Sequence, residues 1–167
     1  MNVVSESRYL SYYIILTLVI GGLAFTPWVL ASYGQFPAEL VAVPMLIGGL
    51  SPTIAAFIAS YLEYGRRGPA RLFGQFGRRF PARWILVPFL LPLAVSASAV
   101  LLWQAFGGVY ILSLLSLASF LPVFVTALVQ NVWEGVGWRG YALPKLQSRY
   151  GALISSVIIG VFWTLWH

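Results

Sequence analysis

The sequence predicts an all-α, polytopic membrane helix bundle with about five transmembrane helices and a cytoplasmic N-terminus. Three observations favour this fold class. Of the 167 residues, 60% are hydrophobic and only 8% are charged, whereas soluble domains are about 25% charged. The apolar residues form runs long enough to cross about 30 Å of hydrocarbon as helices. Six of the ten basic residues fall between positions 66 and 83, between two such runs.

A single membrane domain is expected over residues 1–167. The first run is interpreted as an uncleaved span, because Glu6 lies beside Arg8 where a signal peptide would have a clearly basic segment. The second run contains proline and glycine, which membrane helices tolerate and which permit close helix contact. The predicted spans are residues 9–30, 40–62, 84–106, 111–134 (continuing helical to about 148) and 151–167.

The loop charges predict the orientation. The arginine-rich loop 63–83 is expected to be cytoplasmic and to lie against an anionic leaflet. The segment after the fourth span carries Arg139, Lys145 and Arg149, whereas the other two connections carry no Lys or Arg. This alternation predicts a multi-pass protein of a prokaryotic plasma membrane, with lipids as partners. Nucleic-acid binding is disfavoured, because the positive charge lies between apolar spans.

Few side chains in this sequence could act in catalysis or bind a metal ion. The chain has no Cys, which excludes disulfides and cysteine-based nucleophile or metal chemistry. It has no Asp, four Glu and one His. An ionisable side chain inside a span costs about 2.5–3.5 kcal/mol on insertion scales and therefore indicates function. Glu134 and His167 are the two candidates.

The spacing of these two residues predicts that they meet. A turn is expected at Tyr150–Gly151, because glycine can end a helix. Glu134 lies sixteen residues before Tyr150 and His167 sixteen after Gly151, so each is about 24 Å from the turn along a helix. An antiparallel hairpin would bring carboxylate and imidazole to one depth, where they could polarise water or share a metal ion. Alternatively, Glu134 pairs with Arg139 or lies at the interface, and His167 is a solvated terminal residue.

The run from Asn131 to Gln147 resembles the first motif of the CPBP intramembrane proteases, the CAAX protease and bacteriocin-processing family, also called Abi. The family pattern is Glu-Glu-x-x-x-Arg, usually continued as Gly-Trp-Arg-Gly. Glu134 matches the first Glu, Gly137-Trp138-Arg139-Gly140 matches the continuation, and Gly135 replaces the second Glu. The segment from Trp163 to His167 is similar to the second motif, Phe-x-x-x-His. Residues 49–56 and 65–68 also look like the family's second span and arginine loop.

The resemblance implies a helix bundle with a cavity open to the cytoplasmic side and hydrolysis of a peptide bond within or at the membrane. Glu134 would be the general base that activates water, and His167 would position that water or bind metal. Zinc is the expected metal, with Glu134 and His167 as tentative ligands, although a metal-free glutamate mechanism is also argued for the family. The substrate class stays open between a prenylated protein, a bacteriocin precursor and another membrane peptide.

Five further residues are expected to support this site. A Glu at position 135 would stand four residues before Arg139, the favourable order for a helix ion pair, so Gly135 is interpreted as removing a structural pair rather than the base. Trp163 lies four residues before His167, so its ring should pack against the imidazole. The expected supports are Arg139, Trp138 and Trp163, and the residues that could hydrogen-bond to the site from one turn earlier are Gln130 and Asn131.

Family members continue through further spans that carry another His and often an Asn or Asp. The chain is therefore expected to be C-terminally truncated, and its two candidate ligands are fewer than the three protein ligands of a usual catalytic zinc site. Two hypotheses remain: the N-terminal part of an intramembrane endopeptidase, or a non-catalytic membrane protein of immunity or scaffold type that keeps the fold. A small transporter is disfavoured, because the sequence contains no paired repeats.

Overall fold

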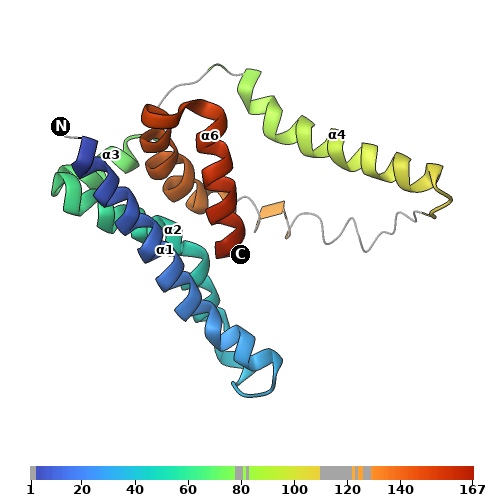
Figure 1. Cartoon of the computed structure of the whole chain (residues 1–167). Helices are drawn as coiled ribbons and strands as arrows, with labels where there is room; N and C mark the ends of the chain where they lie inside the picture. Colours follow the sequence, from blue (N-terminus) through green and yellow to red (C-terminus); the bar gives the residue numbers. More distant parts are fainter. Residues whose placement is uncertain (1–2, 78–80, 82, 110–121, 123, 126–128) are drawn as a thin grey trace. The chain divides into compact units, whose positions relative to one another are not determined.

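A computed structural model describes residues 3–77, 81, 83–109, 122, 124–125 and 129–167. Every regular element within these ranges is helical (Figure 1), so the predicted all-α membrane bundle is confirmed. Contacts divide the chain into two compact units, one of Met1–Phe76 with Thr126–His167 and one of Gly77–Val125. Three described segments are long and apolar enough to cross a membrane: Arg8–Ser32, Ala38–Tyr64 and Val129–Trp166.

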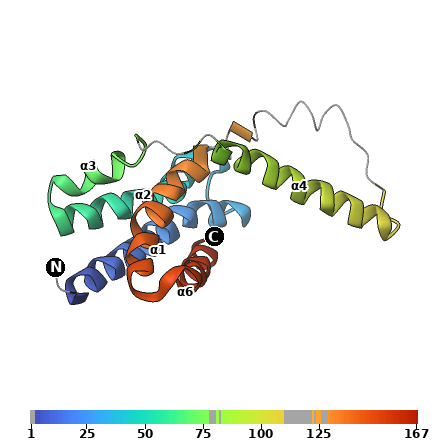
Figure 2. The same cartoon turned by 90° about the horizontal axis from the view of Figure 1, so that it is seen from above.

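The first unit is built on a long antiparallel pair of helices (Figures 1 and 2). Helix α1 (Val3–Ser32) includes the first predicted span, and α2 (Ala42–Tyr64) returns beside it after the short 3-10 turn η1 (Ala38–Leu40). Gly48 of α2 packs against the ring of Phe25, where a Cβ atom would collide with the ring. The small residues of α2 therefore let the two helices approach closely, as predicted.

The arginine-rich segment folds back onto α2 as the short helix α3 (Arg67–Phe73). Gly65 turns the chain with a φ of 61°, and Gly68 lies directly against the backbone carbonyl of Ser60. The structure differs from the predicted loop 63–83 at its start. Glu63 is helical and belongs to α2, and its carboxylate pairs with Lys145 of α6.

The second unit contains helix α4 (Arg83–Ala105), which covers the third predicted span and includes the apolar stretch Leu93–Ala105. A turn at Gly107 with a φ of 82° follows it. Most of the fourth predicted span, 111–134, lies outside the described residues, which resume continuously at 129.

The rest of the first unit is a helical hairpin. A helix over 129–135 runs into a π-helix, η2 (Val136–Ala142), and then into α6 (Leu143–Trp166). Gly151 interrupts α6 with a φ of 72° and a ψ of 177°, a conformation that residues with a Cβ rarely adopt. The chain reverses there (Figure 1), at the predicted position. The π-helix was not predicted; such turns are rare and concentrate at functional sites.

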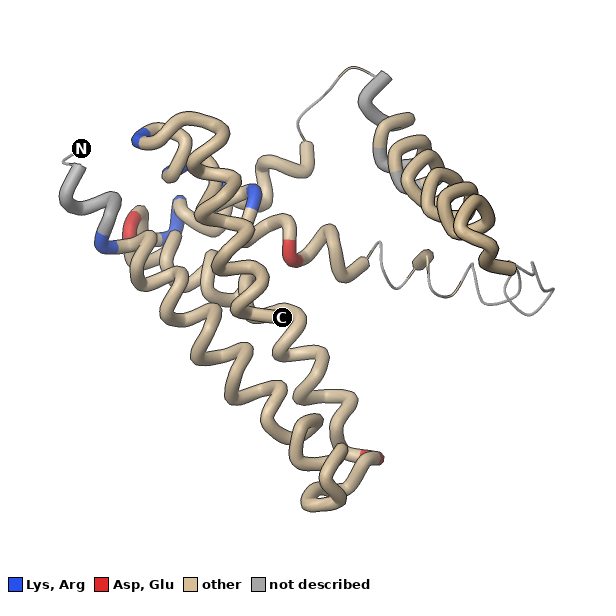
Figure 3. Tube along the Cα trace, turned by 45° about the vertical axis from the view of Figure 1, so that its right-hand side comes forward, with Lys and Arg blue, Asp and Glu red and all other residues tan. Residues whose placement is uncertain are grey.

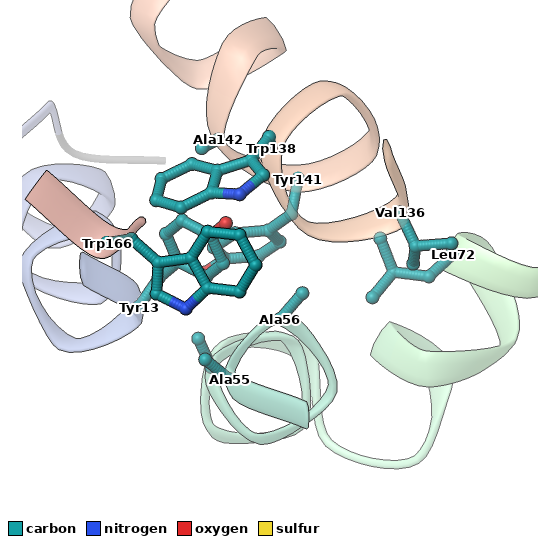
Figure 4. Packing of buried hydrophobic residues seen from close by; sticks show 10 residues of the cluster. Tyr13, Ala55, Ala56, Leu72, Val136, Trp138, Tyr141, Ala142 and Trp166 are labelled. Carbon is teal, nitrogen blue, oxygen red and sulfur yellow. The ribbon is translucent and has the colours of Figure 1, made fainter. Parts of the chain in front are cut away.

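An aromatic cluster joins these helices (Figure 4). Tyr13 of α1 packs against two rings of η2, with centroid distances of 5.5 Å to Trp138 and 5.3 Å to Tyr141. Trp166, at the end of α6, meets Trp138 edge-on at 6.4 Å. Small residues of α2 leave room for these rings, and all of these side chains belong to one buried core. The core therefore fixes the end of α6 against α1, α2 and η2.

Charge is distributed unevenly along the first unit (Figure 3). Its Lys and Arg residues gather toward the end of the α1–α2 pair that holds the N-terminus, whereas Glu39 lies in the turn at the opposite end. Cytoplasmic ends of membrane helices carry such an excess of basic residues. The asymmetry is what the predicted orientation requires, and the orientation itself stays a prediction.

Candidate functional site

Glu134 and His167 line one cavity of about 940 Å³ in the first unit. The two arms of the C-terminal hairpin supply them, and α1 and α2 supply most of the apolar wall. The Gly151 turn thus brings the carboxylate and the imidazole together, as the spacing argument predicts. Among the wall residues are Phe25, Trp28, Val29, Met45, Leu46 and Leu50.

Trp163 contacts both groups. Its indole N–H donates a hydrogen bond to Oε2 of Glu134 at 3.3 Å. Its ring packs on the imidazole of His167 with centroids 4.2 Å apart. One side chain therefore orients the carboxylate and the imidazole at once, which agrees with the predicted packing of residues 163 and 167.

The backbone fixes which imidazole nitrogen is free. Nδ1 of His167 lies 3.1 Å from the carbonyl oxygen of Trp163. Because a carbonyl can only accept, the hydrogen bond requires the proton on Nδ1, and the neutral ring then has its lone pair on Nε2. Nε2 is therefore the nitrogen that can accept a hydrogen bond from water or bind a metal ion.

Trp166 holds His167 in place, and sequence reasoning missed it. Its indole N–H donates to the hydroxyl of Ser51 at 2.8 Å, and its ring meets Phe25 at 5.9 Å. A Cβ on Gly21 would collide with the indole. The next residue, His167, packs edge-on against Trp166 at 4.6 Å. The only sequence signal was a glycine pair in an otherwise apolar first span.

The other predicted site residues are divided between two cavities. Gln130 lines the large cavity with Glu134. Asn131, Trp163 and Arg139 line a neighbouring cavity of about 260 Å³ whose wall also includes Glu134. Glu134 therefore lies between the two cavities and can be approached from either.

Trp138 and Arg139 both line the smaller cavity but differ in exposure. Trp138 is buried, with 2% of its surface exposed, and belongs to the aromatic core. Arg139 is exposed, and its Nη1 lies 3.7 Å from where a Cβ on Gly135 would stand. A Glu at position 135 would thus be within reach of the guanidinium, as predicted. Arg139 forms no ion pair with Glu134 or with any other described residue.

Contacts from α2 and from the segment after α3 hold the helix that carries Glu134. Gly137 lies directly against the carbonyl of Pro52, and the hydroxyl of Thr53 donates to the carbonyl oxygen of Trp133. The side-chain amide of Gln75 donates to the carbonyl oxygen of Gly140 at 3.0 Å. These contacts to backbone atoms fix the position of Glu134 along the axis of α2.

A buried ion pair fixes the same helix further along. Nζ of Lys145 lies 2.5 Å from Oε1 of Glu63, and their side chains are 13% and 3% exposed. The hydroxyl of Tyr141 donates to the other carboxylate oxygen at 3.0 Å. Both oxygens of Glu63 are therefore occupied, which explains why this acid is buried at the end of α2.

The described residues do not make a complete zinc site. They contain no group of three or more His, Asp or Glu side chains that could hold a metal ion, whereas catalytic zinc usually has three protein ligands. Glu134 and His167 supply two donors. What the pair can do without further ligands is bind and polarise one water molecule.

Two comparisons with known proteins bear on this site. Residues 116–167 match the family model described as type II CAAX prenyl endopeptidase Rce1-like. The chain is also 33% identical over 151 residues to CAAX prenyl protease 2 of Methanococcus maripaludis, an alignment that covers 84% of this chain and 55% of the relative. The chain thus spans about half the length of that curated relative, and the matched family region contains both Glu134 and His167.

Proposed function

The chain belongs to the Rce1-like CAAX prenyl endopeptidase family, and on this basis we propose that it carries part of the site of an integral membrane endopeptidase. The proposed substrate is a prenylated protein, in keeping with the name of the relative. The earlier bacteriocin-precursor and unrelated-peptide alternatives receive no support from the comparisons.

One observation carries the proposal: Glu134 and His167 share a cavity, with Trp163 touching both. A general base and a second polar group beside one space are what water activation needs. The wall of this cavity is mostly apolar, so it also suits a substrate that carries a hydrocarbon chain.

In the proposed reaction, a water molecule sits between the carboxylate of Glu134 and Nε2 of His167. Glu134 takes one proton of the water as its oxygen attacks the scissile carbonyl carbon. The protonated Glu134 then gives this proton to the amide nitrogen as the C–N bond breaks, so the carboxylate is regenerated. His167 accepts a hydrogen bond from the same water and orients it. Trp163 is a positioning residue for both.

Zinc stays a prediction. The described residues provide two candidate ligands, Glu134 and His167, and no step above depends on a metal ion. A zinc site would need a further ligand from outside the described residues. Activity measured with and without a chelator tests this: strong inhibition that added zinc reverses would support a metal site.

The second candidate function is a non-catalytic membrane protein that keeps the fold. It would account for the incomplete donor set of the described residues, which supply only Glu134 and His167. It predicts intact membrane insertion with no cleavage of any prenylated peptide by the wild-type protein.

The test is cleavage of a prenylated peptide by membranes that contain the longest open reading frame carrying this chain. Glu134→Gln should lower the rate at least about 100-fold, because general-base catalysis contributes about 10²–10⁴-fold. Glu39→Gln is the matched control, since it makes the same change at an exposed residue in the α1–α2 turn. It should cleave at the wild-type rate. Cleavage retained by Glu134→Gln would refute the role assigned to Glu134.

A further inference from the structure

A separate polar cavity of about 310 Å³ lies at the basic end of the first unit. It is open to the surface and is lined by the end of α2, by α3 with the segment after it, by η2 and by the start of α6. Its wall shares no residue with the two cavities around Glu134. Besides Tyr141, the polar side chains in its wall are Ser60, Tyr64, Arg71, Gln75, Lys145 and Ser148.

Two cations of this cavity are held on one aromatic ring. The guanidinium of Arg71 lies 4.8 Å from the ring centroid of Tyr64, and Nζ of Lys145 lies 5.4 Å from it. The two residues come from α3 and α6, far apart in the sequence. Two cations beside one ring raise the local positive potential, which favours the binding of an anion.

Among the described residues, one carboxylate pairs with these cations. Glu63 binds Lys145 through Oε1 and accepts from Tyr141 through Oε2. Arg71 is exposed, so its guanidinium donors are accessible to an anion from outside the protein, and none of the described carboxylates pairs with it.

We propose that this cavity binds a phosphate group. A guanidinium presents a planar set of N–H donors that matches two phosphate oxygens, and the ammonium of Lys145 has a third N–H beyond its contacts with Glu63 and Tyr64. Tyr64 is the last residue of a membrane-spanning helix, so the cavity lies near the level of lipid headgroups. A lipid headgroup and a free phosphate ion offer the same chemistry.

The test measures thermal unfolding of the purified protein in neutral detergent. The additions are phosphatidylglycerol, diacylglycerol with the same acyl chains, inorganic phosphate, and chloride at matched ionic strength. We expect phosphatidylglycerol or phosphate to raise the unfolding temperature by several degrees and their phosphate-free counterparts to have little effect. A shift with the lipid alone identifies a headgroup site, and a shift with phosphate alone identifies a site for a soluble phosphate.

Two matched variants locate the effect. Arg71→Gln removes the charge in the cavity, and Arg67→Gln removes the same charge from the same short helix outside the cavity. Arg71→Gln should lose most of the shift, whereas Arg67→Gln should keep it. If Arg71→Gln does not fold, Arg71→Lys, which keeps the charge but loses the planar donors, should show a clearly reduced shift. No shift in the wild type, or equal losses at positions 67 and 71, would overturn the proposal.

Discussion

The first unit has two ends that are built differently. At the basic end, Glu63, Lys145 and Tyr141 satisfy one another while nearly buried, and α3 lies directly on α2. At the other end, the helices line a large cavity, and the residues proposed for catalysis are partly or fully exposed. The helix of the first motif runs from one end to the other.

This difference indicates that one end of the helix serves stability and the other end carries the candidate site. The contacts at the basic end and the aromatic core make the height and rotation of the helix rigid. The proposed catalytic residues at the cavity end then rest on a helix whose position is fixed elsewhere. Substitutions at the basic end are therefore expected to lower the free energy of unfolding. Substitutions at the cavity end are expected to lower the cleavage rate.

The largest effect on stability is expected at the buried ion pair. Lys145→Met leaves the carboxylate of Glu63 buried without its cation, which should cost about 3–5 kcal/mol of unfolding free energy. The double variant Glu63→Gln with Lys145→Met should recover most of this loss, because no charge stays buried. Denaturant unfolding in detergent measures both. Equal stability of the single variant and the wild type would contradict the proposed rigidity of the basic end.

An intermediate effect on stability is expected for a substitution where η2 packs against α2. Gly137→Ala places a Cβ onto the carbonyl of Pro52 and should destabilise by about 1–3 kcal/mol, as overpacking does. Gly160→Ala is the matched control, since a Cβ there meets nothing within 4 Å. It should stabilise slightly, by up to about 1 kcal/mol, because alanine favours a helix. A Gly137→Ala variant that is at least as stable as the wild type would contradict the tight contact between η2 and α2.

The smallest effect on stability is expected for substitutions of Gly135, beside the guanidinium of Arg139. Gly135→Glu places a carboxylate within reach of its guanidinium, and Gly135→Gln gives nearly the same helix preference without the charge. The Glu variant should exceed the Gln variant by about 0.5 kcal/mol in unfolding free energy, and the difference should shrink at high salt. A lower stability of the Glu variant would mean that Glu134 repels the new carboxylate more than Arg139 attracts it.

The sequence was sufficient for the features that depend on local chemistry or on helix length. The turn at Gly151 follows from the freedom of glycine, and the meeting of Glu134 with His167 follows from equal distances along two helices. The packing of Trp163 on His167 follows from their spacing. Each of these needs only the geometry of a helix and the position of one break.

Other features depend on contacts between distant segments, which leave no local pattern. Glu63 looked like a loop residue, because its partner is more than eighty positions away in the chain. Trp166 could not be told from Trp163 until Ser51 and Gly21 were placed beside it. The π-helix changes only which backbone groups pair, so Val136–Ala142 carries no distinctive composition for it.

The central claim is that Glu134 and His167 face one shared cavity, and the absence of native cysteine makes this directly measurable. Glu134→Cys with His167→Cys, treated in native membranes with a short bismaleimide, should form a cross-link within one chain that mass spectrometry detects. Tyr150→Cys with His167→Cys is the control, because a helix separates those residues by about 24 Å. We expect an efficient cross-link for the first pair and little for the second. No cross-link for the first pair, or one no stronger than the control, would contradict the account.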